Sequence, residues 1–228
     1  MTYQNIICGE AVETLKTFKD ESVDLVVTDP PYLCKYRDRD GRSITNDTNP
    51  EAVLGVFPEL YRVLKQDSYC LLFCGWNAIA QFSAAWEAAG FRVGGHIIFA
   101  KPYTSKAKHV GYCHESAWVL TKGRPAPRTN PLNDVQEWHY TGNKNHPTEK
   151  SVEVIAPLIR SFSRPGDTVL DPFLGSGTSV VAATLNGRNA IGIELNARYC
   201  RHAEQRLAGV TRYLTAKQKS TNVLEVAA

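Results

Sequence analysis

The chain has 228 residues, enough for one α/β domain with a sizeable core and short for two full domains. Its 43% hydrophobic and 21% charged residues are ordinary for a globular protein and exclude disordered and fibrous classes. No apolar run approaches the length of a membrane span, and the N-terminus lacks a basic stretch followed by an apolar core. We therefore expect a cytoplasmic protein.

The six cysteines are scattered, and none forms a Cys-x-x-Cys pair. Without a secretion signal, this pattern predicts reduced thiols and no metal site. The net charge of +3 is mild but uneven, because basic residues cluster just after Tyr32 and again between Lys101 and Lys150. Such clusters are usually solvated loops, and they would form a phosphate-binding surface only if both border one site.

Short β-rich runs alternate with longer helical patterns, which indicates a mainly parallel sheet covered by helices. We predict strands at Asn5–Cys8, Val23–Thr28, Tyr69–Cys74, Val93–Ala100, Ser116–Thr121, Asp167–Leu170 and Ala190–Ile193. We predict helices at Ala11–Phe18, Pro50–Lys65, Ala78–Ala89, Glu149–Phe162, Ser179–Leu185 and Ala197–Leu207. The strands Val93–Ala100 and Ser116–Thr121 are expected to form an antiparallel pair.

One segment interrupts this alternation. From Lys122 to Asn145 the chain is rich in Gly, Pro, Asn and polar residues without periodicity, and a loop of that length is usually functional or flexible. Residues 215–228 are small and polar and predict a flexible tail. We expect residues 1–214 to form a single domain.

A glycine-containing turn follows the strand Asp167–Leu170. It leads into the next helix and reads Asp171-Pro172-Phe173-Leu174-Gly175-Ser176-Gly177-Thr178. Glycines let the backbone approach a ligand, and the helix N-terminus offers free N–H groups. A Gly-x-Gly turn alone is more often structural, but Glu194 ends the next strand, where a carboxylate can bind both ribose hydroxyls. The Asp171 carboxylate suits a cofactor with a cationic amino group better than one with a pyrophosphate.

The tetrapeptide Asp29-Pro30-Pro31-Tyr32 follows the strand Val23–Thr28. Ligands of open α/β sheets bind beyond the carboxyl ends of strands, so this position suits a site. The Asp29 carboxylate and the Pro30 carbonyl could each accept an N–H bond from an exocyclic base amine, which would favour a pyramidal nitrogen. The prolines stiffen the loop, and Tyr32 offers a face on which a displaced base can stack. Taken alone, such a tetrapeptide is a surface turn about as often as a catalytic motif.

Together, the two motifs resemble those of amino-type DNA methyltransferases, which methylate an exocyclic base amine with S-adenosylmethionine. The resemblance extends roughly from Asn5 to Leu207. It implies that Asp29 to Tyr32 are catalytic, that Asp171 to Thr178 bind the cofactor, and that Glu194 binds its ribose. Asp in the first position of the tetrapeptide is associated chiefly with adenine N6, and Ser there is more typical of cytosine N4 enzymes.

The catalytic motif precedes the cofactor motif, as in the circularly permuted beta group of this family. The resemblance therefore implies a Rossmann-like class I methyltransferase fold, with a mainly parallel seven-stranded sheet and one antiparallel strand. Strands Asn5–Cys8 and Val23–Thr28 would be the third and fourth of the standard sheet. Strands Thr168–Leu170 and Ala190–Ile193 would be the first and second.

Two further segments carry the resemblance. His146-Pro147-Thr148-Glu149-Lys150 is similar to the family segment that precedes the cofactor loop. This similarity implies that Thr148 and Lys150 lie near the methionine end of the cofactor. Glu10 stands where the family often has an aspartate near the cofactor adenine.

Beta-group enzymes usually carry a target-recognition domain, and this chain leaves room for no large one. Only the loops at 33–49 and 123–145 are available for DNA recognition. Candidate contacts with bases and phosphates of double-stranded DNA are Lys35, Arg37, Arg39, Arg124, Arg128, Trp138, His139 and Lys144. For any one of them, local packing within a mobile loop is an equal alternative. We expect a short or degenerate recognition site, and a homodimer would supply more contact surface.

Two alternatives stay open. The first keeps the chemistry but has cytosine N4 or RNA as the substrate. The second is a catalytically inactive DNA-binding regulator with the same fold, although degenerate members usually lose the catalytic Asp or a cofactor glycine, and Asp29, Gly175 and Gly177 are present. We identify no nuclease motif in the chain, so a solitary methyltransferase and one from a restriction-modification system are both open.

Overall fold

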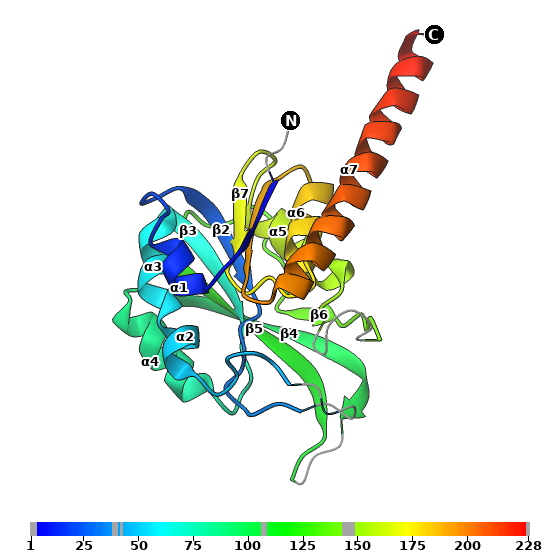
Figure 1. Cartoon of the computed structure of the whole chain (residues 1–228). Helices are drawn as coiled ribbons and strands as arrows, with labels where there is room; N and C mark the ends of the chain where they lie inside the picture. The colour runs from blue at the N-terminus through cyan, green and yellow to red at the C-terminus, as the bar shows by residue number, and fades with distance from the viewer. Residues whose placement is uncertain (1–3, 38–40, 42, 106–108, 143–148, 227–228) are drawn as a thin grey trace.

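The computed structural model describes residues 4–37, 41, 43–105, 109–142 and 149–226, with side chains to residue 217. Within these ranges, a sheet of eight strands lies between two layers of helices (Figure 1). The strand order is β1-β8-β7-β2-β3-β5-β4-β6. The helices found in the described residues are all too short or too polar to cross a membrane.

All the predicted strands form, and one more appears. The strands are β1 (Gln4–Cys8), β2 (Val23–Thr28), β3 (Leu64–Phe73), β4 (Arg92–Ser105), β5 (Tyr112–Lys122), β6 (Val135–Glu137), β7 (Thr168–Asp171) and β8 (Asn189–Glu194). The prediction of seven strands was one short, because β6 lies inside the segment predicted as a loop. Three residues are too few to show a strand periodicity, and β6 exists only through its pairing with β4.

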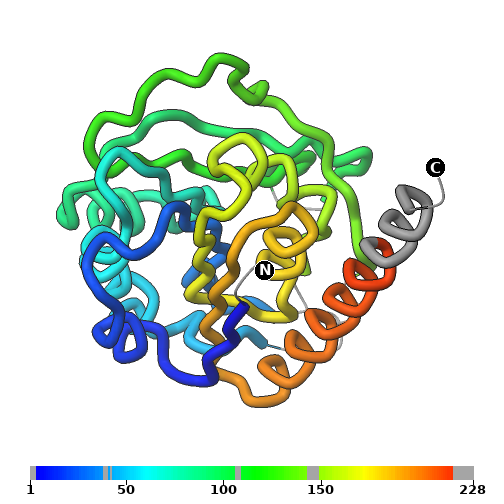
Figure 2. Tube along the Cα trace, turned by 90° about the horizontal axis from the view of Figure 1, so that it is seen from above, coloured from blue at the N-terminus to red at the C-terminus, as the bar shows by residue number. Residues whose placement is uncertain are grey.

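The helices are α1 (Ala11–Leu15), α2 (Pro50–Leu54), α3 (Val56–Val63), α4 (Ile79–Ala88), α5 (Val152–Phe162), α6 (Thr178–Leu185) and α7 (Ala197–Val226). The predicted helix Pro50–Lys65 is divided at Gly55, and β3 begins at Leu64, earlier than expected. Helix α7 does not end at Leu207. Residues 215–226, expected to form a tail, continue it as a helix that projects from the body of the molecule (Figure 1). The preceding part of α7 lies at the periphery of the molecule (Figure 2).

The sheet confirms the permuted fold. Strands β7 and β8, which come last in the chain, insert between β1 and β2, and all four are parallel. The order from the β1 edge is therefore third, second, first and fourth strand of the standard sheet, as the motif order implied. Strand β5 is antiparallel to both β3 and β4.

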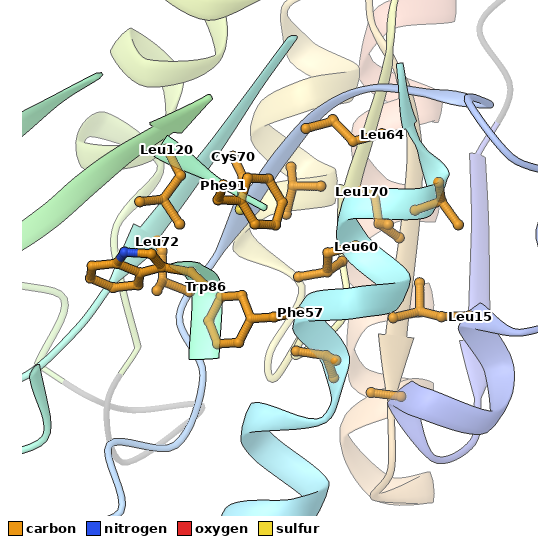
Figure 3. Packing of buried hydrophobic residues seen from close by; sticks show 14 of the residues in the cluster. Leu15, Phe57, Leu60, Leu64, Cys70, Leu72, Trp86, Phe91, Leu120 and Leu170 are labelled. Carbon is orange, nitrogen blue, oxygen red and sulfur yellow. The ribbon is translucent and has the colours of Figure 1, made fainter. Parts of the chain in front are cut away.

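Alternating side chains of the central strands fill a core on each face of the sheet, because successive strand residues point to opposite faces. On one face, Val26, Cys70 and Leu72 pack against α1, α3 and α4, where Phe57 and Trp86 are fully enclosed (Figure 3). On the other face, strand residues including Leu25 and Phe73 pack against α5 and α6. This double covering holds the carboxyl ends of the parallel strands in fixed positions.

Candidate active site

The two sequence motifs meet where β2 and β7 lie side by side. Val26 of β2 pairs with Leu170 of β7, so the residues that follow both strands leave the sheet at the same edge. The Thr28 hydroxyl donates to Asp171 Oδ1 at 2.8 Å and joins segments 143 residues apart. The strand order runs in opposite directions on the two sides of this pair: β8 follows β7 on one side of the sheet, and β3 follows β2 on the other. Such a switch point is the usual ligand site of an open α/β sheet.

The Asp29 carboxylate is the centre of the tetrapeptide. The Tyr32 hydroxyl donates to Asp29 Oδ1 at 2.7 Å, and Lys150 Nζ donates to Oδ2 at 2.5 Å. Burial raises the pKa of Tyr32 well above its ordinary value, and the charge of Asp29 raises it further. Tyr32 therefore stays a protonated donor at neutral pH and fixes the orientation of the carboxylate.

Two cavities meet at the tetrapeptide. The acidic cavity, as we call it, is lined by Gly9, Glu10, Pro172, Phe173, Gly175, Glu194 and neighbouring residues. The aromatic cavity, of about 430 Å³, is lined by residues including Tyr32, Trp76, Tyr103, Tyr112, Trp138 and Tyr140. Asp29, Pro30 and Ile44 line both. A ligand in one cavity can therefore approach a ligand in the other beside Asp29.

The glycine turn forms one wall of the acidic cavity. Gly175 and Gly177 have φ values of 55° and 91°, and a Cβ on Gly177 would lie 2.7 Å from the Ala203 Cβ. The Glu194 carboxylate accepts N–H bonds from Gly175 at 2.8 Å and from Asn196 at 2.7 Å. Burial raises the pKa of Glu194, and these N–H bonds oppose that shift. The carboxylate is thus held at the cavity wall at the end of β8.

Asp171 has a more structural environment than the sequence suggested. Asp171 is only 6% exposed. Its carboxylate accepts hydrogen bonds from the Thr28 hydroxyl, from the Ser179 hydroxyl at 2.5 Å and from the Phe173 N–H at 3.0 Å. Burial raises its pKa to about 6, against these hydrogen bonds. Asp171 therefore ties the glycine turn to β2 and α6, and its side chain has few lone pairs left for a ligand.

The structure pairs the Lys150 ammonium with the carboxylate of Asp29, the first residue of the tetrapeptide. Glu10 lines the acidic cavity, and its carboxylate also caps α1 by accepting the Glu13 N–H at 2.8 Å. Thr148, Arg39 and Lys144 lie outside the described residues.

The DNA-contact candidates divide into two groups. Trp138 lines the aromatic cavity, and His139 is exposed beside it. Lys35 and Arg37 lie in the segment that leads from Tyr32 toward Ile44 at the cavity junction, where Arg37 pairs with Ser43. The remaining two candidates lie elsewhere.

Arg124 and Arg128 line a separate cavity near the amino ends of β2 and β7, together with Asp24. The Arg124 N–H donates to Asp67 Oδ1 at 2.7 Å, and the Arg128 guanidinium lies 5.1 Å from the centre of the Tyr69 ring. The structure therefore does not bring these two arginines to the site that contains Asp29.

Several side chains of the aromatic cavity were missed in the sequence. Strand β4 contributes Lys101, Tyr103 and Ser105, and strand β5 contributes Tyr112, His114, Glu115 and Ser116. Apart from Glu115, both sets follow a period of two, which is the signal of one strand face and could have grouped them. Trp76, which follows β3, stacks on Tyr112 with ring centres 5.7 Å apart, and this pairing across the sheet has no sequence signal.

Comparison with known proteins identifies the family. Residues 23–205 match the family model described as DNA methylase, N6_N4_Mtase. The chain is 52% identical over 206 residues to the YubD protein of Escherichia coli (strain K12), covering 90% of this chain and 91% of YubD. It is 32% identical to the type II methyltransferase M.HpaI of Haemophilus parainfluenzae, over 90% of this chain and 74% of M.HpaI. It is 27% identical to the DNA adenine methyltransferase YhdJ of E. coli (strain K12), over 92% of this chain and 84% of YhdJ.

Solved structures agree. The complex of M1.HpyAVI with S-adenosylmethionine superposes with a TM-score of 0.68 at 25% identity, covering 90% of this chain and 99% of that one. The cytosine-N4-specific PvuII DNA methyltransferase has a TM-score of 0.73 at 18% identity, over 93% of this chain and 91% of the PvuII chain, and shows the shared fold.

The acidic cavity fits S-adenosylmethionine. Glu194 stands at the end of β8, where it can accept hydrogen bonds from ribose hydroxyls, and the carboxylates of Glu10 and Glu194 suit a cofactor with sulfonium and ammonium charges. Gly175 lines this cavity without a Cβ, which lets the turn approach a ligand, whereas the missing Cβ of Gly177 leaves room for Ala203. The chain belongs to the amino-type DNA methyltransferases, which use S-adenosylmethionine to methylate an exocyclic amine of adenine or cytosine.

Proposed function

We propose that this protein methylates N6 of adenine in double-stranded DNA, with the target base flipped into the aromatic cavity. The observation that carries this proposal is the position of Asp29 and Pro30 in the walls of both cavities. Duplex DNA hides the amine inside the base stack, so the base must leave the helix to reach them. Stacking on aromatic rings such as Tyr32 would offset part of the lost base stacking.

The chain's own groups orient the amine. The bound cofactor supplies a methyl group on a sulfonium sulfur. Asp29 accepts one amine N–H and the Pro30 carbonyl accepts the other, which directs the nitrogen lone pair toward the acidic cavity. As the nitrogen–methyl bond forms, the sulfur–methyl bond would break and the sulfonium would leave as a neutral thioether. Asp29 would stabilise the positive charge that develops on the nitrogen during this direct in-line displacement, and the nitrogen would then lose one N–H proton to solvent. Exclusion of water by the surrounding rings strengthens this interaction.

Adenine is favoured over cytosine by the aspartate at the first position of the tetrapeptide, a feature associated chiefly with N6 enzymes. The name of YhdJ, a DNA adenine methyltransferase, agrees. The cytosine-N4-specific PvuII enzyme shares the fold, so cytosine is the second candidate. Digestion of methylated DNA to nucleosides and mass measurement separate N6-methyladenine from N4-methylcytosine. A product containing N4-methylcytosine alone would refute the adenine assignment.

The catalytic assignment is tested by Asp29→Asn, with Asp24→Asn as a matched control. Both aspartates belong to or directly follow β2 and pair with a lysine, and their side chains are 21% and 20% exposed. We expect Asp29→Asn to lower methyl transfer by at least about 100-fold, with little change in cofactor affinity. Asp24→Asn lies at the other end of the strand and should keep its activity.

A labelled-methyl assay on DNA and calorimetric binding of S-adenosylmethionine give both readouts. Equal activity of the Asp29→Asn and Asp24→Asn variants would refute the role of Asp29. DNA binding by the wild-type protein without any methyl incorporation would instead favour the inactive regulator.

A further inference from the structure

The ammonium of Lys150 has an environment that the proposed reaction does not yet explain. Its side chain is 8% exposed, and among the described residues its hydrogen-bond partner is Asp29 Oδ2 at 2.5 Å. Three aromatic rings surround it, with their centres 5.7 Å (Tyr32), 5.0 Å (Phe73) and 5.8 Å (Trp138) from Nζ. A buried cation is thus held beside the catalytic carboxylate, at the wall of the aromatic cavity.

An ammonium has three N–H donors, and here one is used by a carboxylate. Cation–π contacts with the rings stabilise the charge but do not replace hydrogen bonds to the other two donors. Asp29 also keeps acceptor capacity, since each carboxylate oxygen has two lone pairs. The pair therefore presents an acceptor and a donor side by side to a ligand in the aromatic cavity.

This pattern complements the edge of the target base. Flipping breaks the Watson–Crick bonds of adenine and leaves its N6 amine as a donor and its N1 as an acceptor. In a cavity that excludes water, an unsatisfied N1 would be unfavourable. Asp29 satisfies the amine in the proposed function, but it cannot donate to N1.

We propose that Lys150 donates a hydrogen bond to N1 of the flipped adenine, so that Asp29 and Lys150 together bind its amine and ring nitrogen as a two-point contact. This inference rests on the proposed function. The three aromatic rings around Lys150 keep its ammonium in place when the target amine also donates a hydrogen bond to Asp29. N3 of cytosine, next to its N4 amine, offers the same contact, so Lys150 recognises the amine edge that both bases share.

The test uses a synthetic duplex containing the target site, located by modification sequencing of DNA methylated by the wild-type protein. Three versions carry adenine, 1-deazaadenine or 7-deazaadenine at the target position. The first analogue replaces the N1 acceptor by C–H, and the second replaces N7 while keeping N1. The kcat/KM for methyl transfer is measured for the wild-type protein and for Lys150→Met, which keeps most of the length of the side chain but has no donor.

For the wild-type protein, we expect 1-deazaadenine to lower kcat/KM by about 10- to 100-fold relative to adenine, as for loss of a hydrogen bond to a charged group. 7-Deazaadenine should be methylated at a similar rate to adenine. Lys150→Met should be slower on adenine and should show little further loss with 1-deazaadenine. This non-additivity separates a direct contact from the altered reactivity of the analogue.

Lys101→Met is the matched control. Lys101 is another lysine of the same cavity with an 8% exposed side chain, and it pairs with Glu115 and lies 5.7 Å from the centre of the Trp138 ring. It does not contact Asp29, so the Lys101→Met variant should keep the full preference for adenine over 1-deazaadenine.

Equal losses with 1-deazaadenine for the wild type and Lys150→Met would overturn the proposal, as would a loss specific to 7-deazaadenine. A Lys150→Met variant that has a raised KM for S-adenosylmethionine, and the wild-type preference between the bases, would assign Lys150 to the cofactor instead. Failure of the proposed function is distinct, because the wild-type protein would then methylate no adenine in the sequencing step.

Discussion

The guanidinium of Arg206 links α7 to the site, and Arg206→Met tests what this link contributes. Arg206 Nη1 donates to Glu149 Oε1 at 3.1 Å and to the Ser176 carbonyl at 2.8 Å. The Glu149 side chain is 4% exposed and that of Arg206 23%. Methionine keeps much of the apolar stem of arginine but removes its charge. The Glu149 carboxylate would then stay buried after losing this ion pair.

Removing one partner of a buried ion pair typically costs about 3–5 kcal/mol in folding free energy. The Ser176 hydroxyl still donates to Glu149 Oε1 at 3.2 Å, and Arg206 is partly solvated, which reduces the loss. We therefore expect a loss at the lower end, about 3 kcal/mol. For a chain of this length, that corresponds to a Tm lower by about 6–12 °C.

Urea unfolding and thermal melting, both followed by circular dichroism, measure the change. Arg201→Met is the control, because Arg201 is exposed on the same helix and its loss should change stability by less than about 0.5 kcal/mol. Adding Glu149→Gln to Arg206→Met should recover part of the stability, since the buried charge is then gone. Equal stability of the Arg206→Met and Arg201→Met variants would refute the reasoning.

Two further changes test the glycine turn by chemical unfolding. Gly177→Ala should lower the free energy of unfolding more than Gly166→Ala. Both glycines have φ near 90°, but a Cβ on Gly177 would lie 2.7 Å from the Ala203 Cβ, whereas a Cβ on Gly166 would meet no atom within 4 Å. Equal losses would contradict this. The folded-state pKa of Asp171, about 6, exceeds its ordinary 3.8, so the wild type loses stability as pH rises through that window. Asp171→Asn does not titrate there, and its stability relative to wild type should rise with pH over the same window. A pH-independent difference would refute the burial argument.

Much of the fold could be predicted because it follows from local patterns. Apolar runs such as Val23–Thr28 have the composition of buried strands, and the order of the two motifs implied the permuted sheet that β7 and β8 complete. Errors arose where local patterns carry little information. Gly55 divides a continuous helical pattern, and β6 is too short to be recognised. Helix α7 continues past Leu207 through a polar stretch that lacks an amphipathic signal.

Whether a predicted site residue lies at the site depended on whether its place in the sheet could be inferred from the local sequence. Asp29 directly follows β2 and Glu194 ends β8, while Pro30 and Gly175 lie in the turns after β2 and β7, so the parallel sheet brings all four to one edge. Arg124 was grouped with the site by its charge and its place in the segment 123–145, and the long β5 strand carries it to the opposite end of the sheet.

By itself, the sequence determined the family, the cofactor and the tetrapeptide to which we assign the orientation of a base amine in the proposed function. These properties reside in short segments whose residue types and strand-end positions are dictated by the chemistry. Only the tertiary structure decided that Lys150 contacts Asp29, 121 residues away, and that Arg206 supports the same segment through Glu149. The physical reason is that a buried charge is stable only when it is paired, and its partner comes from a distant segment that packs beside it. Local sequence periodicity does not indicate which segment that is.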